Sequence, residues 1–330
     1  MTSDYFKGKR VLVAGGSGFV GTNLTASLLL RGAQVRSTYY KKSPRQRLDE
    51  VEYVPTNLLL ENDCKRATKD VDFVFMAAAE SSGAAVMEKT PLVHLTPNII
   101  MNAQMLAAAY ENKVGRFCFI SSNTVYPVTD FAVKEDDAEY DFFEKYFIVG
   151  WMKRFSEIMC EMYSSRIENT METVTVRPGN LYGPFDKFNY RESKAIAALI
   201  RRAIEAEDPF LVWGDGYDVK DFLYIDDFIE GLLLVFEHAK DFKPVNIASG
   251  QPITIREVVE VILECTGYKP TNLKFDSSKP TMIPKRLIDT KRISKLTSWT
   301  PKTTLKDGIS NTVIWYQEMF KGKTPEEIET

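Results

Sequence analysis

Histidine is nearly absent from this chain of 330 residues, in which only His94 and His238 occur. The four cysteines stand far apart and form no CxxC pair. Because a transition-metal site takes several such side chains close together, the sequence gives no cluster of metal ligands. We expect the cysteines to be reduced and structural, and each histidine to serve packing or the surface rather than catalysis.

The chain also lacks a strong excess of either charge and any long apolar run. Its net charge is -3, and no long stretch carries one sign, which argues against binding nucleic acid or an anionic membrane as the main task. No segment reaches the ~18 consecutive apolar residues of a membrane span, and residues 1–9 lack the apolar core of a signal peptide. We therefore expect a cytoplasmic protein.

A glycine-rich loop follows the first strongly apolar segment, Arg10–Ala14. Gly15 permits a tight turn, Gly18 lets the backbone approach a pyrophosphate, and Gly21 allows close packing of a helix on the strand. A helical pattern follows and ends at Gly32. Glycines also mark ordinary turns, but the strand before and the helix after favour a dinucleotide whose diphosphate lies at the helix N-terminus.

Strand-like and helical segments alternate through the first half of the chain. This rhythm predicts βαβ units and therefore a doubly wound α/β fold with a parallel sheet. The expected segments are strands over 10–14, 34–38, 51–54, 71–77, 117–121 and 172–176, with helices over 19–31, 98–111 and 150–164.

The rhythm breaks after Gly179, where loops rich in proline, glycine and charge separate helices near 193–205, 226–238 and 255–266. We expect residues 1–180 to bind a dinucleotide and residues 181–330 to form mainly a smaller substrate domain over the carboxyl ends of the strands. Segments near 218–248 are expected to return to the first domain, with Val245–Ala248 as a further strand.

The end of the second predicted strand favours NADP over NAD as cofactor. An acidic residue usually takes the ribose hydroxyls of NAD there, whereas this chain has Tyr39, followed by Tyr40, Lys41, Lys42 and Arg45. Cations can pair with a 2′-phosphate, and a tyrosine can stack on adenine. An exposed basic loop is the other interpretation, and NAD remains the alternative cofactor.

Over nearly its whole length the chain resembles the extended short-chain dehydrogenases/reductases of the nucleotide-sugar epimerase/dehydratase family. The resemblance implies a Rossmann-type sheet, an NAD(P) cofactor and a nucleotide-sugar substrate. Within the family, Ser121–Pro127 and Gly183–Phe188 are most similar to the GDP-fucose synthases. The segments that carry the resemblance are Gly15–Gly21, Ala77–Ala79, Asn98, Ser121–Tyr126, Arg177–Pro184, Trp213–Gly216 and Asp221–Asp227.

The family uses a Ser or Thr, a Tyr and a Lys in a YxxxK helix, and this chain departs from that set. Ser122 matches the serine and Lys153 the lysine, which would hold the nicotinamide ribose. The tyrosine position is Val149, which cannot donate a proton. Tyr146 lies about one helical turn further from Lys153 and is a candidate substitute, or else a surface tyrosine. Thr124 is a second hydroxyl candidate for catalysis.

Two further departures concern epimerisation at C3 or C5. Epimerising relatives use a cysteine with either a histidine or a lysine as acid and base. The cysteine position is Thr124 here, the histidine position is Phe185, and the lysine position falls near Asn189, with Lys187 close by. A neutral hydroxyl is a poor base for a carbon acid, which argues against epimerisation by the usual pair.

The remaining site residues follow from the loop and from the resemblance. For the cofactor they are Gly15, Ser17, Gly18, Phe19, Val20, Gly21, Tyr39, Lys41, Lys42, Asn57, Leu58, Ala77, Ala78, Ala79, Asn98 and Lys153. For the sugar nucleotide they are Asn180, Lys187, Arg191, Lys194, Lys220 and Arg286. Trp213 is expected in the core.

The helices near 98–111 and 150–164 carry more apolar residues than one stripe needs, so we expect a homodimer through them, as in the relatives. The leading hypothesis is an NAD(P)-dependent oxidoreductase or epimerase acting on a nucleotide-activated sugar, which we expect to be GDP-linked. A binding protein of weakened catalysis, with a regulatory or assembly role, is the alternative.

Overall fold

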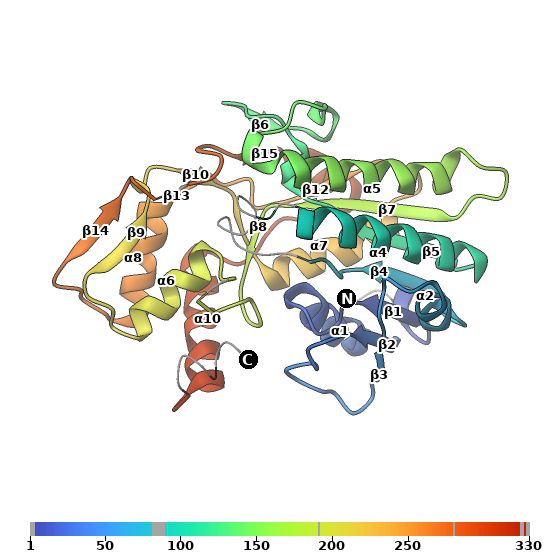
Figure 1. The fold of residues 1–330 in the computed structure, drawn as a ribbon, viewed down its shortest axis with the longest axis horizontal. Helices are drawn as coiled ribbons and strands as arrows, with labels where there is room; N and C mark the ends of the chain where they lie inside the picture. The colour runs from blue at the N-terminus through green and yellow to red at the C-terminus, as the bar shows by residue number, and fades with distance from the viewer. Residues whose placement is uncertain are drawn as a thin grey trace.

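A computed structural model describes residues 4–80, 90, 92–190, 192–279, 281–323 and 327 (Figure 1). Seven parallel strands form its central sheet, in the order β12-β7-β5-β4-β1-β2-β3. They are β1 (Arg10–Ala14), β2 (Gln34–Tyr39), β3 (Glu52–Pro55), β4 (Phe73–Met76), β5 (Arg116–Ile120), β7 (Glu172–Pro178) and β12 (Val245–Ile247).

The inner strands are buried on both faces, which explains their unbroken apolar sequences. In β1, Val11 and Val13 face one core cluster while Leu12 and Ala14 face the other, as the two-residue period of a strand requires. The chain order reverses at β1, which lies between β2 and β4. A crevice at the carboxyl ends of the strands is expected at such a reversal, and ligands bind there in open α/β sheets.

Helices cover both faces of the sheet (Figure 1). Two of them, α1 (Phe19–Leu30) and α7 (Ile225–His238), contact each other on one face. On the other face α4 (Leu92–Glu111) contacts both α2 (Glu61–Thr68) and α5 (Phe147–Ser165). The doubly wound α/β architecture predicted from the sequence is therefore confirmed.

Much of the second half of the chain forms a smaller group of elements, drawn on the left of Figure 1. Its helices are α6 (Ala195–Ile204), α8 (Ile255–Thr266) and α10 (Leu305–Phe320), whereas α9 (Lys291–Thr297) contacts α7 and β12. Its short paired strands are β8 (Asn180–Tyr182), β9 (Phe210–Trp213), β10 (Val219–Lys220), β11 (Phe222–Tyr224), β13 (Ile253–Thr254) and β14 (Leu273–Asp276), while β15 (Leu287–Ile288) pairs with β6 (Ala132–Val133).

Short 3-10 helices complete the described elements: η1 (Asp4–Phe6), η2 (Asn123–Val125), η3 (Glu135–Asp137) and η4 (Glu144–Tyr146). No helix among the described residues is long and apolar enough to cross a membrane.

Three sequence expectations differ from the structure. Helix α4 begins at Leu92, six residues before the predicted start, and contains Pro97. Helices α2, α9 and α10 were not predicted. Trp213 is the last residue of β9 and is 42% exposed, so its expected place in the core is wrong.

Candidate active site

The glycine loop between β1 and α1 has the geometry of an anion cradle. Gly15 has φ +84°, and a Cβ on it would lie 2.6 Å from Cα of Ala78. A Cβ on Gly21 would overlap the carbonyl oxygen of Gly15. Gly18 is the N-cap of α1 and no side chain caps this helix, which leaves its first-turn N–H groups for a ligand. The loop therefore fits a dinucleotide diphosphate, with Ser17 and the first helical residues Phe19 and Val20 around it.

Small residues follow β4 and border this loop. The amide of Ala77 donates to the carbonyl of Ala14 at 3.0 Å, which ties Ala77–Ala79 to the end of β1. Asn98 on α4 is buried, accepts from the Glu80 amide at 2.9 Å and donates to the Glu80 carbonyl at 3.0 Å. Asn98 therefore positions the segment that ends the alanine run.

At the end of β2, the cation beside Tyr39 is Arg47, which was not predicted from the sequence. The guanidinium of Arg47 lies 5.7 Å from the centre of the Tyr39 ring, and Lys41 and Lys42 are exposed. The guanidinium of Arg45 donates to the carbonyl of Asp186 at 3.0 Å. Free cations next to an aromatic ring are compatible with a 2′-phosphate and an adenine.

Asn57 and Leu58, the predicted cofactor residues after β3, lie in a turn that local hydrogen bonds and burial stabilise. The amide of Asn57 donates to Asp63 at 2.9 Å, and its side-chain oxygen accepts from Leu59 at 3.2 Å. Leu58 is buried among the residues of a core cluster.

The hydroxyls after β5 differ in their hydrogen bonding. Oγ of Ser122 accepts from the Thr124 amide at 3.2 Å and caps η2. Oγ1 of Thr124 is buried and has no hydrogen-bond partner within the described part of the chain. Because an unpaired buried hydroxyl is destabilising, a hydrogen bond to a ligand would stabilise Thr124 more than Ser122.

Lys153 projects from α5 toward the carboxyl end of β5. Its Nζ donates to the Ile120 carbonyl at 2.8 Å and lies 4.9 Å from the centre of the Phe119 ring. Burial lowers the pKa of Lys153 to about 8; the charge of Glu157 opposes this and that of Lys194 adds to it. One turn before it, Val149 offers no polar atom.

Tyr146 is the N-cap residue of α5 and lies near a different cation. Burial raises the pKa of Tyr146 to about 12, against the charge of Arg286. Arg286 is buried and donates to the carbonyls of Pro127 at 2.8 Å and Tyr126 at 3.1 Å. Burial lowers the pKa of Arg286 to about 10.

Three other residues predicted to contact the substrate already form hydrogen bonds or ion pairs within the chain. The Asn180 amide group donates to the Asp221 carbonyl at 3.0 Å, and Nζ of Lys187 lies 3.1 Å from Glu192. Nζ of Lys220 donates to Asp218 at 3.2 Å and also to the Ile283 carbonyl.

Two predicted contacts remain. Lys194 precedes α6 and is exposed, and Arg191 lies outside the described residues.

A buried ion pair under Lys153 was not predicted. Glu157 and Arg177 are 0% and 1% exposed, and Nε and Nη2 of the arginine donate to the carboxylate at 2.8 and 2.7 Å. Ser121 donates to the same carboxylate at 2.5 Å, and Arg154 at 3.2 Å. The Arg-Pro-Gly segment and Glu157 were both visible in the sequence, but their contact was not.

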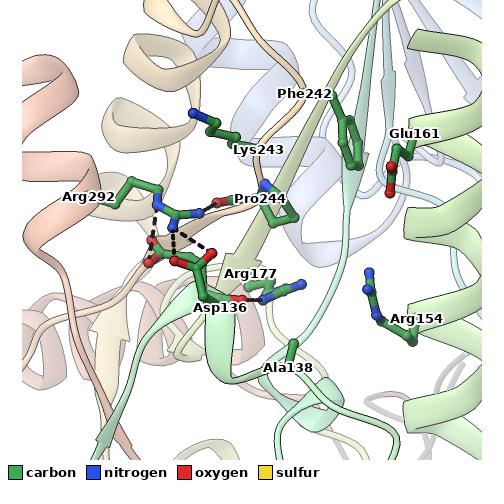
Figure 2. Close-up of a pocket in the computed structure, with 10 residues that line it drawn as sticks. Asp136, Ala138, Arg154, Glu161, Arg177, Phe242, Lys243, Pro244 and Arg292 are labelled. Atoms are coloured by element: carbon green, nitrogen blue, oxygen red, sulfur yellow. Dashed lines mark hydrogen bonds and ion pairs between the residues drawn. The ribbon is translucent and has the colours of Figure 1, made fainter. Parts of the chain in front are cut away.

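Figure 2 shows a cavity of about 450 Å³ beside this pair, lined from α5, β7 and the segment before β12. Arg292 in its wall donates to both oxygens of Asp136 at 2.9 Å and to the Pro244 carbonyl at 2.9 Å. Arg177 is likewise held by Glu157. Two of the cations that line the cavity, Arg177 and Arg292, therefore already have partners.

Residues 11–248 match the model of the NAD dependent epimerase/dehydratase family. The chain belongs to this family. It is 30% identical over 317 residues to a GDP-L-fucose synthase of Sinorhizobium fredii, covering 92% of this chain and 94% of the relative. It is 29% identical over 336 residues to GDP-mannose 3,5-epimerase 1 of Oryza sativa subsp. indica, covering 97% and 85%.

The fold matches that of a solved family structure. A GDP-L-fucose synthetase from Naegleria fowleri bound to NADP superposes with a TM-score of 0.80 at 20% identity, over 96% of each chain. The family resemblance inferred from the sequence is therefore confirmed.

Proposed function

We propose that this protein is an NAD(P)-dependent nucleotide-sugar oxidoreductase/epimerase that acts by hydride transfer at the ring of a GDP-linked 4-keto sugar or hexose. One observation carries the proposal: the uncapped α1 N-terminus after Gly15 and the ammonium of Lys153 both lie at the carboxyl end of one parallel sheet. A dinucleotide across the crevice would have its diphosphate at α1 and its nicotinamide ribose at Lys153.

The cofactor in this proposal is NADP, with NAD as the alternative. When bound, the nicotinamide supplies or accepts the hydride. The chain itself binds and orients it through the glycine loop, Ala77–Ala79 and Lys153, while Lys41 and Lys42 give charge for a 2′-phosphate. The cofactor of the Naegleria fowleri protein is NADP, which supports this choice.

The substrate proposal rests on cations and on the relatives. The charge of Lys194 acts on Lys153, and the charge of Arg286 acts on Lys220. The proposed contacts of the diphosphate are Lys194, Lys220 and Arg286. The two relatives described above are named for GDP-linked sugars. Thr124 and Phe185 stand where epimerising relatives have a cysteine and a histidine, so reduction of a 4-keto sugar is the better supported reaction.

A cofactor titration followed by a turnover assay tests the proposal. We expect NADPH to bind more tightly than NADH, read by nucleotide and protein fluorescence. We then expect GDP-4-keto-6-deoxymannose to cause oxidation of NADPH, read at the nicotinamide absorbance. Binding without oxidation, over a panel of GDP-, UDP- and dTDP-linked 4-keto sugars, would contradict an oxidoreductase.

A binding protein that keeps both sites is the second candidate. The observation that favours it is the turn before Lys153, where Val149 replaces a proton donor. Such a protein would bind NADPH and a GDP-sugar with no turnover in either direction. The same assay separates the two candidates.

We also propose a cytoplasmic homodimer that binds neither nucleic acid nor membrane. Its interface would lie on α4 and α5, where Ile100, Trp151, Phe155 and Met162 are exposed. Large exposed apolar side chains on neighbouring helices are typical of a subunit contact.

A further inference from the structure

Reduction of a carbonyl needs a proton as well as a hydride, and the described site has few groups that could supply it. This inference therefore rests on the function proposed above. Ser122 has a neutral hydroxyl, which is a poor general acid near neutral pH, and its Oγ accepts from the Thr124 amide. Burial raises the pKa of Tyr146 to about 12. General acids work best when their pKa lies near the working pH, so Tyr146 is poorly matched.

The buried carboxylates nearby are committed to other partners. Glu157, one turn after Lys153, accepts from Ser121 and from both Arg154 and Arg177. Asp221 accepts from Ser249 and from the Gly250 amide. Neither is available to a substrate oxygen.

Lys153, in contrast, is a cation whose protons are mostly uncommitted. Its Nζ makes one hydrogen bond, to Ile120 at 2.8 Å, and no ion pair of Lys153 occurs in the described part of the chain. Burial lowers its pKa to about 8, with the charge of Lys194 adding to this and that of Glu157 opposing it. Val149, one helical turn before Lys153, has an apolar side chain and so cannot accept a hydrogen bond from the Lys153 ammonium.

Thr124 lies on the element that packs against this part of α5. A Cβ on Gly150 would lie 2.9 Å from the carbonyl oxygen of Thr124, so η2 meets α5 between Val149 and Lys153. Oγ1 of Thr124 is buried and has no hydrogen-bond partner among the described residues. An unpaired buried hydroxyl on the element that contacts α5 within one turn of Lys153 suits an oxygen atom that accepts from both residues.

We propose that Lys153 is the proton donor of the reaction and that Thr124 holds the same substrate oxygen by a hydrogen bond. Hydride addition forms a C–H bond at the carbonyl carbon, and the π electrons of C=O move to oxygen. One Nζ–H bond of Lys153 breaks as the O–H bond forms, and the neutral amine regains a proton from water. The ketone is reduced by two electrons and the nicotinamide is oxidised by two.

Lys153→Arg tests the donor role, because arginine keeps the charge but does not release a proton near neutral pH. We expect this variant to retain NADPH binding in the fluorescence titration and to lose a factor of about 10² to 10⁴ in kcat. The matched variant Tyr146→Phe removes the other candidate donor, and we expect its kcat to fall by less than a factor of about 10.

A second readout does not depend on turnover. In the protein without cofactor, the pH dependence of Lys153 labelling by an amine reagent, read by peptide mass spectrometry, should give a pKa near 8. Lys194→Gln should raise it, since the charge of Lys194 lowers the pKa of Lys153. Reduction should slow as pH rises through the pKa of Lys153, and in Lys194→Gln this decline in kcat should move to higher pH together with the labelling curve.

The outcomes separate this inference from the proposed function. If Tyr146→Phe loses as much kcat as Lys153→Arg, or if the kcat profile stays in place while the labelling curve moves, the donor role of Lys153 is wrong and the proposed function stands. If Lys153→Arg keeps full turnover, Lys153 acts only through its charge and its donor role is likewise wrong. If the native protein binds NADPH but never oxidises it, the proposed function and this inference both fail.

Discussion

At the scale of single residues, the site combines an unpaired hydroxyl with an ammonium of lowered pKa. Thr124 and Lys153 come from adjoining elements. Among the described residues, the Thr124 hydroxyl has no hydrogen-bond partner and Lys153 forms no ion pair. A folded protein keeps such costly groups where a ligand completes them. The contribution of each residue to turnover can therefore be measured separately from its contribution to stability.

Thr124→Val should separate them. Valine has a similar shape without the hydroxyl, so the free energy of unfolding should stay the same or rise by about 1 kcal/mol, because a buried unpaired polar group is removed. Turnover should fall with little change in NADPH binding. Thermal unfolding and steady-state kinetics check both, and a large loss of stability would instead indicate a structural hydroxyl.

Asp221 should make stability depend on pH. Burial raises its pKa from 3.8 to about 6, against hydrogen bonds from Ser249 and Gly250. Between these values the folded protein binds more protons than the unfolded chain, so stability present below pH 3.8 is lost as pH rises through 6.

Denaturant unfolding of the native protein and of Asp221→Asn over pH 4 to 7 measures this effect. The difference between the two unfolding free energies should change across this range, to the disadvantage of the native protein at higher pH. A difference that does not vary with pH would contradict the raised pKa of Asp221.

At the scale of elements, the contact between the glycine loop and α1 controls the cofactor crevice. Gly21 lies so close to Gly15 that no side chain fits between them. The helix N-terminus therefore reaches the end of β1 only with glycine at this position.

Gly21→Ala should push α1 away from β1 and cost about 1–3 kcal/mol in stability, as overpacking does. NADPH affinity should fall as well, since the N–H groups of the first turn move. Gly115→Ala is the matched control, because its Cβ would meet the Asp72 carbonyl at 3.4 Å, an ordinary contact. Equal effects of both changes in thermal shift and titration would contradict this account.

Much of the sheet could be predicted from the sequence because the inner strands are short apolar runs. The predicted strand over 10–14 agrees with β1, and that over 117–121 is one residue off β5. The start of α4 was missed because Pro97 resembles a helix boundary, although it lies inside the helix. Strands of two or three residues, such as β10, have no period to detect, and they form only by pairing with distant segments.

The glycine loop and Lys153 were found because each has a local pattern. The ion pair of Glu157 with Arg177 joins residues on a helix and a strand, and only the tertiary structure brings them together. The exposure of Trp213 could not be predicted either, since a tryptophan after three apolar strand residues has the composition of a core segment.

At the scale of the whole molecule, the exposed apolar face of α4 and α5 is the candidate contact with a second copy. Asn102 of α4 donates to Ser156 of α5 at 2.9 Å, which fixes the two helices side by side. They therefore offer one continuous surface.

Phe155→Glu should convert the proposed dimer to a monomer, because a charge on a buried interface is costly to desolvate. Phe155 is 43% exposed, and Leu30→Glu on α1, where the leucine is 87% exposed, is the control that should leave the oligomer unchanged. Light scattering after size-exclusion chromatography gives the mass of each. A native protein that is already monomeric at micromolar concentration would contradict the dimer.

The position of β12 has a consequence for synthesis. This strand completes the edge of the sheet beside β7, yet its residues 245–247 follow most of the chain. During translation the earlier strands emerge from the ribosome with the hydrogen-bonding edge of β7 still open, and an open edge invites pairing with other chains. The edge of β7 therefore stays open to other chains until about three quarters of this chain has been made.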